Sequence, residues 1–307
     1  MAFLRPARAA LLVVLVTAAL AVAACGSGGD GAGSTTSSGA RGDAAPRPVI
    51  VATTPVLGAI VRSAVGDAAD VRVVMPSGSD PHDWRPSARD IAEVQSADLV
   101  VQHGLGLEQG LDDAVSQAAS DGVPVFTATD HVKQRGADPH FWTDPTQVRA
   151  VVAALPTAVR TATGTDVAAS ARQAAAELDA LDSAIAKEFA GVPATARRMV
   201  TGHESLGYLA ARYGLALTGT VTPSLSSQGQ VSAAHLARLE EAMRSAGTRV
   251  VFTETGLPNA VADAIVAETG ATLVPLGVEV LADDGTYVTY IRELTRRIAS
   301  ALSGSGD

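Results

Sequence analysis

The chain has 307 residues, enough for one large or two medium-sized domains with a buried core, so a small disulfide-stapled scaffold is excluded. Its 23 basic and 32 acidic residues give a net charge of −9, which leaves no extended basic surface for nucleic acid. The single cysteine, Cys25, excludes an intramolecular disulfide and a metal site built from several thiolates.

The N-terminal residues have the features of a secretory signal. Two arginines precede the mostly apolar residues 9–24, a run shorter than the roughly 20 apolar residues of a membrane-spanning helix. The run ends in VAAC at residues 22–25, which resembles a bacterial lipobox, in which the cysteine becomes the lipid-carrying N-terminus. We therefore expect a lipoprotein signal peptide over 1–24, a lipid anchor on Cys25 and a location outside the cytoplasm at the cell membrane.

Residues 25–47 are rich in Gly and Ser and lack an apolar period, which predicts a flexible tether. Beyond them, short β-branched runs alternate with helical patterns. The predicted strands cover residues 49–54, 71–75, 98–103, 123–128, 198–202, 215–220, 248–254 and 271–276. This alternation predicts an α/β fold with two similar lobes, over 48–164 and 191–307, each a parallel sheet of about four strands flanked by helices.

Residues 165–190 separate the two lobes. Thr165 and Asp166 offer a helix N-cap, and residues 167–189 contain neither Gly nor Pro and place apolar residues at helical spacing. A helix of this length spans about 34 Å at about 1.5 Å per residue. We expect one long rigid helix that joins the lobes, with an ordinary helix packed inside one domain as the alternative.

The pentad Asp-Pro-His-x-Trp occurs twice, at 80–84 and at 138–142, and uses both tryptophans of the chain. Each copy follows a predicted strand, and ligands of open α/β sheets bind beyond the carboxyl ends of the strands. The proline fixes the turn before the imidazole, and the aspartate is a candidate acceptor for the second ring N–H. The repetition favours His82 and His140 as metal ligands.

A third imidazole, His203, follows the first predicted strand of the second lobe, the equivalent position in the topology. Three neutral imidazoles and one oxygen donor suit Zn²⁺ in a tetrahedral site better than harder cations. Glu279, after the last predicted strand, is the candidate fourth ligand. The alternatives to it are Glu204, Glu254, Asp283 and a water molecule. The remaining histidines, interpreted as structural or surface residues, are His103, His131 and His235.

Several motifs occur in an order that resembles the zinc and manganese receptors of bacterial ABC importers, the cluster A-I solute-binding lipoproteins with a helical backbone. The motifs are DPHDWRPSARDI, HGLGLEQGL, DPHFWTDP, TGHESLGYLAARYGL and VVFTETGLPNAVADAI, and the resemblance covers nearly all of residues 48–302. It implies His82, His140 and His203 as ligands. One alignment adds Glu279, whereas another places Leu276 there and leaves a solvent molecule. Manganese-type members tend to carry glutamate at the third position, so the histidine there favours zinc.

The resemblance implies a monomeric receptor, not an enzyme, that captures Zn²⁺ in the cleft between its lobes and delivers it to an ABC permease and its ATPase. A manganese receptor of the same family is the first alternative. A zinc hydrolase is less favoured because the chain lacks an HExxH motif, and a surface adhesin is a further alternative. Because imidazole binds metal only when neutral, affinity is expected to fall below the ordinary histidine pKa near 6.5.

Overall fold

The computed structural model describes residues 46–254 and 260–304, and residues from Pro46 onward form one compact unit. The predicted signal peptide, Cys25 and all but the end of the predicted tether lie outside the described residues. No helix in the described ranges combines the length and the apolar character that crossing a membrane requires.

The first sheet contains four parallel strands in the order β2-β1-β3-β4. The strands are β1 (Val49–Ala52), β2 (Asp70–Val73), β3 (Leu99–Gln102) and β4 (Val125–Thr127). Alternate side chains of β1 and β3 point to opposite faces, so each face needs a cover of helices. Helix α1 (Pro55–Val65) covers one face, and α2 (Ala88–Gln95) and α3 (Asp112–Ser120) cover the other.

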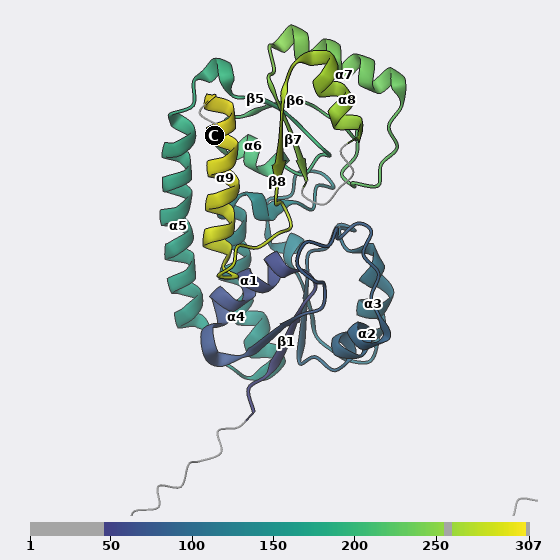
Figure 1. The fold of residues 1–307 in the computed structure, drawn as a ribbon. Coiled ribbons are helices and arrows are strands. Elements are labelled where there is room, and N and C mark those ends of the chain that lie inside the picture. The colour runs from purple at the N-terminus through teal and green to yellow at the C-terminus, as the bar shows by residue number, and fades with distance from the viewer. Residues whose placement is uncertain (1–45, 255–259, 305–307) are drawn as a thin grey trace, which may run out of the picture. The chain divides into compact units, whose positions relative to one another are not determined.

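The second sheet repeats this order as β6-β5-β7-β8, again with parallel strands. The strands are β5 (Arg198–Thr201), β6 (Ala216–Thr220), β7 (Val250–Glu254) and β8 (Thr272–Leu276). Its helices are α6 (Gly207–Tyr213), α7 (Ala233–Ala246), α8 (Ala260–Thr269) and α9 (Tyr287–Ser303). The predicted α/β fold with two similar four-stranded lobes is therefore confirmed (Figure 1).

Helix α4 (Pro145–Thr163) was not predicted from the sequence. Its first turn begins with Pro145, where the missing N–H costs nothing, and Asp144 caps it by accepting the N–H of Thr146 at 2.8 Å. Pro156, however, lies inside the helix, where a proline removes one backbone hydrogen bond and usually ends the helix. Packing of Val148, Val152 and other α4 residues in the core holds the helix together despite Pro156.

The predicted connecting helix is present as α5 (Ala168–Ala190). Its N-cap is Val167 and not the Thr165–Asp166 pair, although the Asp166 carboxylate accepts the N–H of Ala168 at 2.9 Å. The apolar side chains Leu178, Leu181, Ile185 and Phe189 are buried along one side, as their spacing predicts.

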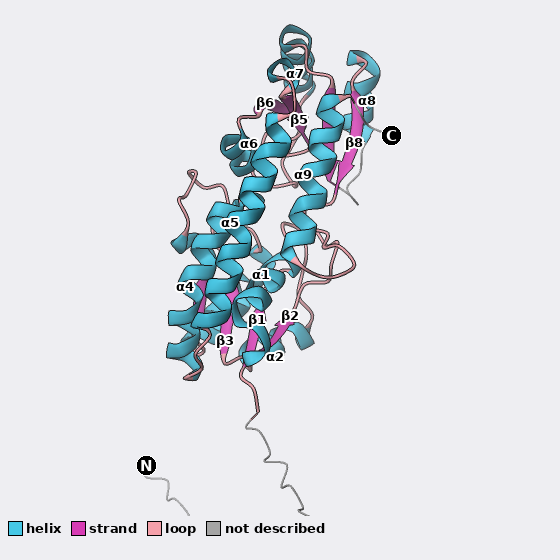
Figure 2. Ribbon diagram, turned by 90° about the vertical axis from the view of Figure 1, so that its left-hand side faces the viewer, coloured by secondary structure: helices cyan, strands magenta, loops and turns pink. Residues whose placement is uncertain are grey.

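The lobes are joined by two long helices, because α9 lies beside α5 (Figures 1 and 2). Helix α9 contacts β8 of the second lobe and α1 of the first. One continuous hydrophobic core includes Ile50 of the first sheet, Leu181 of α5, Ile298 of α9 and Phe252 of the second sheet. Helix α5 carries the chain between the lobes, as predicted, and α9 packs beside it, so the two sheets are anchored to a shared core.

Candidate metal centre

The candidate site lies beyond the carboxyl ends of the strands, and in the second lobe it includes the point where the strand order reverses, between β5 and β7. In the second lobe, His203 follows β5 and Glu254 ends the neighbouring strand β7, so that His203 Nδ1 lies 3.1 Å from Glu254 Oε1. In the first lobe, Thr54 follows β1 and His103 follows β3, and the Thr54 hydroxyl hydrogen-bonds His103 Nε2 at 2.8 Å. His203 therefore corresponds in topology to Thr54, and the predicted equivalence of its position to that of the pentad histidines is wrong, because His82 follows β2 and His140 follows β4.

The two pentads fold alike at their histidines. Asp80 Oδ1 accepts the backbone N–H of His82 at 3.0 Å, and Asp138 Oδ1 accepts that of His140 at 2.9 Å. Such a turn, in which an aspartate bonds the backbone two residues on, fixes the direction in which the following imidazole leaves the chain. The predicted duplication of the histidine presentation is confirmed as local structure.

The aspartates differ in their second role. Asp138 Oδ1 also lies 2.9 Å from His140 Nδ1, as predicted for an acceptor of the second ring N–H. The Asp80 carboxylate instead accepts the hydroxyl of Ser227 and the side-chain amide of Gln228, both from the loop after β6. The prediction therefore holds for Asp138. Asp80 instead links the first lobe to the second through hydrogen bonds.

The three predicted histidines converge. One ring nitrogen from each of His82, His140 and His203 lies within 4.8 Å of the other two, a grouping that could hold a metal ion. Their ring centroids are 5.1 to 5.6 Å apart. His140 and His203 are buried, and the buried Nε2 of His82 has no hydrogen-bond partner among the described residues.

The carboxylates behind two of these rings determine which nitrogen carries the proton. Because His140 Nδ1 hydrogen-bonds Asp138 and His203 Nδ1 lies 3.1 Å from Glu254, these carboxylates favour the tautomer with its proton on Nδ1. The two Nε2 atoms, 3.3 Å apart, then direct lone pairs toward the same space. Two lone pairs at this distance repel each other unless a cation lies between them.

The spacing suits a small tetrahedral ion. Two nitrogens that each bind zinc at about 2.0–2.1 Å in tetrahedral geometry stand about 3.3–3.4 Å apart. The Nε2 atoms of His140 and His203 already stand 3.3 Å apart, so this pair needs little rearrangement to share such an ion.

The environment keeps the imidazoles neutral, which is the form that coordinates metal. Burial, and then the neighbouring His140 and His203, lower the pKa of His82 to about 4. Burial also lowers the pKa of His140, against the opposing effect of the Asp138 carboxylate. Both rings are therefore uncharged at neutral pH and ready to bind.

Glu279 lines the same cavity of about 90 Å³ as His82 and His203. Burial, followed by the charges of three nearby carboxylates, raises the pKa of Glu279 well above its ordinary value. These carboxylates are Asp80, Glu108 and Glu254. The alternative position, Leu276, is the buried last residue of β8. The cavity is lined by two of the three imidazoles and by Asp80, Glu254 and Glu279, which favours a bound cation. Glu279 lies on the wall of this cavity but is not in the group of donor atoms within 4.8 Å of one another, which contains the three histidines alone.

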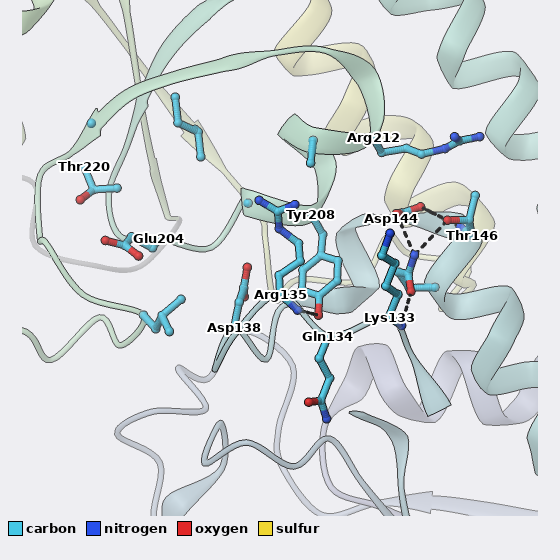
Figure 3. A pocket seen from close by; sticks show the side chains of 16 residues that line it. Lys133, Gln134, Arg135, Asp138, Asp144, Thr146, Glu204, Tyr208, Arg212 and Thr220 are labelled. Atoms are coloured by element: carbon cyan, nitrogen blue, oxygen red, sulfur yellow. Dashed lines mark hydrogen bonds between the residues drawn. The ribbon is translucent and has the colours of Figure 1, made fainter. Parts of the chain in front are cut away.

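The other candidates for a fourth ligand are placed less well. Glu204 is exposed and lines a separate hollow of about 870 Å³ that also reaches Asp138 and Tyr208 but has no histidine in its lining (Figure 3). Asp283 is exposed on the loop before α9. Glu254 is engaged by His203 and by the Ser205 hydroxyl, which donates to Oε1 at 3.0 Å.

The supporting role of Glu254 was not predicted. Burial alone would raise the pKa of Glu254, but its contacts with His203 and Ser205 outweigh burial and hold the pKa below its ordinary value. The Glu254 carboxylate is therefore ionised and acts on His203 as Asp138 acts on His140. Its position at the end of the strand beside β5 was the one sequence signal for this role.

The remaining histidines have structural surroundings, as predicted. His103 is buried against Trp142, and burial, followed by the nearby His140, lowers its pKa to about 3. His131 stacks on Phe126, and His235 hydrogen-bonds a backbone carbonyl of β6.

Gly202 allows Glu254 to approach His203, which gives a first test. A Cβ at Gly202 would lie 2.1 Å from Glu254 Oε2, so Gly202→Ala must displace that carboxylate. Loss of such an outer-shell partner typically costs about 10–100-fold in metal affinity. We expect this loss in a zinc titration of Gly202→Ala, with an unchanged circular dichroism spectrum. Parent-like affinity would show that Glu254 does not orient His203.

Comparison with known proteins places the chain in a family. A family model described as "Zinc-uptake complex component A periplasmic" matches residues 50–301. The chain belongs to this family. The match includes most of both lobes, the whole of α5 and all four candidate ligands.

Individual members of the family are named for different metals. The chain is 25% identical over 276 residues to the iron-binding protein YfeA of Yersinia pestis, covering 86% of this chain and 88% of that one. It is 25% identical to the zinc-binding protein TroA of Treponema pallidum, covering 84% and 89%. It is 28% identical to the high-affinity zinc uptake system protein ZnuA of Bacillus subtilis, covering 67% and 70%.

The fold agrees with this membership. The solved structure of TroA from Treponema pallidum superimposes with a TM-score of 0.72 at 22% identity, covering 84% of this chain and 99% of that one. The two-lobed architecture is therefore the architecture of a known metal-binding protein of this family.

Proposed function

We propose that this protein captures one Zn²⁺ ion outside the cytoplasm through His82, His140, His203 and Glu279 and delivers it to an ABC permease and its ATPase. The observation that carries the proposal is the convergence of three imidazoles, with the Nε2 atoms of His140 and His203 only 3.3 Å apart. Membership in a family of zinc-uptake components supports the same function.

Zinc is preferred over manganese because of the donor set. Three imidazoles and one carboxylate form a borderline-soft, tetrahedral set, whereas manganese favours more oxygen donors in an octahedral arrangement. Relatives named for zinc, such as TroA and ZnuA, support zinc, while MntA of Bacillus subtilis, 25% identical and named for manganese, keeps manganese as the alternative.

The anchor and the domain plan belong to the same proposal. A signal peptide over 1–24, lipidation at Cys25 and a tether over 25–47 would hold a monomeric receptor beside the membrane that contains its permease. In this plan, lobes over 48–164 and 191–307 and the helix over 165–190 form the receptor body. Names of relatives such as the manganese-binding lipoprotein MntA support the anchor.

A metal-content measurement tests the proposal. The purified mature protein, stripped by a chelator and reloaded, should bind one zinc ion per chain, and equimolar manganese should not displace it. The variant with all three histidines replaced by alanine should bind none. Equal zinc binding by parent and triple variant, or preferential loading with manganese, would contradict the proposal.

A further inference from the structure

The two pentad tryptophans lie in different surroundings. Trp84 is half-buried and packs on the α2–α3 side of the first lobe. Trp142 is fully buried, and its indole Nε1 donates a hydrogen bond to the carbonyl of Val278, 3.3 Å away in the second lobe. Trp142 therefore links the segment of His140 to the residue that precedes Glu279.

Two tyrosines of α9 complete this link. The Tyr290 hydroxyl donates to the same Val278 carbonyl at 2.6 Å, and the Tyr287 hydroxyl donates to the carbonyl of Trp142 at 2.8 Å. Both tyrosines are buried in the first turns of α9. We name Trp142, Tyr287, Tyr290 and the Val278 carbonyl the Val278 clamp.

The Val278 clamp acts on a short turn after β8, and the Val278 side chain itself is buried in the core. Residues 277–280 follow β8 and are closed by a hydrogen bond from Val280 N–H to the Gly277 carbonyl at 3.3 Å. The Glu279 side chain on this turn lines the cavity beside His82 and His203. Two donors on the Val278 carbonyl fix the position of this turn.

Buried hydroxyl and indole groups need acceptors, so the clamp geometry is well determined. A buried polar group left without a partner costs about 1–3 kcal/mol. Moving the turn away would leave the Trp142 N–H and the Tyr290 hydroxyl unpaired together. The core of the protein therefore disfavours displacement of the backbone that carries Glu279.

We propose that Trp142, Tyr287 and Tyr290 are positioning residues that hold Glu279 within reach of the ion bound by the histidines. This inference rests on the proposed function, because it assigns the clamp a role in completing the zinc site. The inference assigns Trp142, in the second pentad, a role that Trp84 in the first pentad does not have.

A double-mutant cycle tests the clamp through Glu279. Tyr290→Phe removes one buried hydroxyl and keeps the ring, and zinc affinity is measured for it alone and combined with Glu279→Gln. We expect about a 10–100-fold loss of affinity in the parent background. In the Glu279→Gln background the further loss should be less than about twofold, because the residue through which Tyr290 acts is already gone. Tyr213→Phe is the matched control, since the buried Tyr213 hydroxyl donates to Asp182 and should leave affinity unchanged.

Cobalt supplies a readout that a general loss of stability would not change. The visible spectrum of Co²⁺ depends on its ligand set, so Co²⁺-loaded Tyr290→Phe should resemble Co²⁺-loaded Glu279→Gln and differ from the parent. Tyr287→Phe repeats the cycle from the other end of the clamp and replaces Tyr290→Phe if that variant fails to fold.

Parent-like affinity in Tyr290→Phe and Tyr287→Phe would overturn the inference, and so would an equal loss with and without Glu279. Failure of the parent itself to bind zinc would instead refute the proposed function.

Discussion

Replacing His140 with alanine is expected to weaken zinc binding by more than about 100-fold, because loss of even an outer-shell partner costs about 10–100-fold. His140 is the most buried of the three imidazoles, and its Nε2 lies nearest to that of His203. The variant should still fold, since Asp138 keeps its bond to the backbone N–H at position 140. Competition against a chromophoric chelator measures the affinity.

His131→Ala is the control for this substitution. His131 is exposed and stacks on Phe126, away from the cluster, so its removal should leave zinc affinity unchanged. Circular dichroism and thermal unfolding of both variants separate loss of the site from loss of the fold. Equal affinities of His140→Ala and the parent would remove His140 from the ligand set.

Zinc binding at neutral pH is expected to release a proton from Glu279. Burial and neighbouring carboxylates raise the pKa of Glu279 well above its ordinary value, so protons compete with the metal for this carboxylate. Below that pKa, zinc affinity should rise about tenfold per pH unit as pH increases.

The sequence alone predicts that zinc affinity falls below about pH 6.5, the ordinary histidine pKa. For His82 this expectation changes, because its pKa is lowered to about 4 and protons compete with the metal for this ring only in more acidic solution.

Calorimetric titration at pH 7 in two buffers of different ionisation enthalpy counts the released protons. The parent should release one more proton than Glu279→Gln, in which position 279 has no acidic proton. Zinc binding without proton release, or equal release by both proteins, would contradict the assignment of Glu279.

The fold was predictable where local pattern and burial agree. β-Branched runs located the eight strands of the described residues, and the Gly- and Pro-free stretch that ends at Phe189 located α5. Helix α4 was not predicted because a proline such as Pro156 usually ends a helix, whereas tertiary packing maintains this one. The partnership of α5 with α9 depends on contacts between residues far apart in the chain, which periodicity does not report.

The histidines of the candidate site were predictable because a repeated motif and topology both pointed to them. The duplicated pentad identified His82 and His140, and the position after β5 identified His203. The residues that support these histidines were harder to identify from the sequence. Glu254 was one of several carboxylates until the pairing of β5 with β7 placed it beside His203, and the contact of Trp142 with Val278 joins residues 136 positions apart.

A crystal structure of the zinc-loaded mature protein, with anomalous diffraction recorded on both sides of the zinc absorption edge, tests the central claim most directly. The account predicts a single strong zinc peak bonded to the Nε2 atoms of His82, His140 and His203 and to a carboxylate oxygen of Glu279. A zinc ion bound elsewhere, or one that leaves any of these three imidazoles uncoordinated, would contradict it.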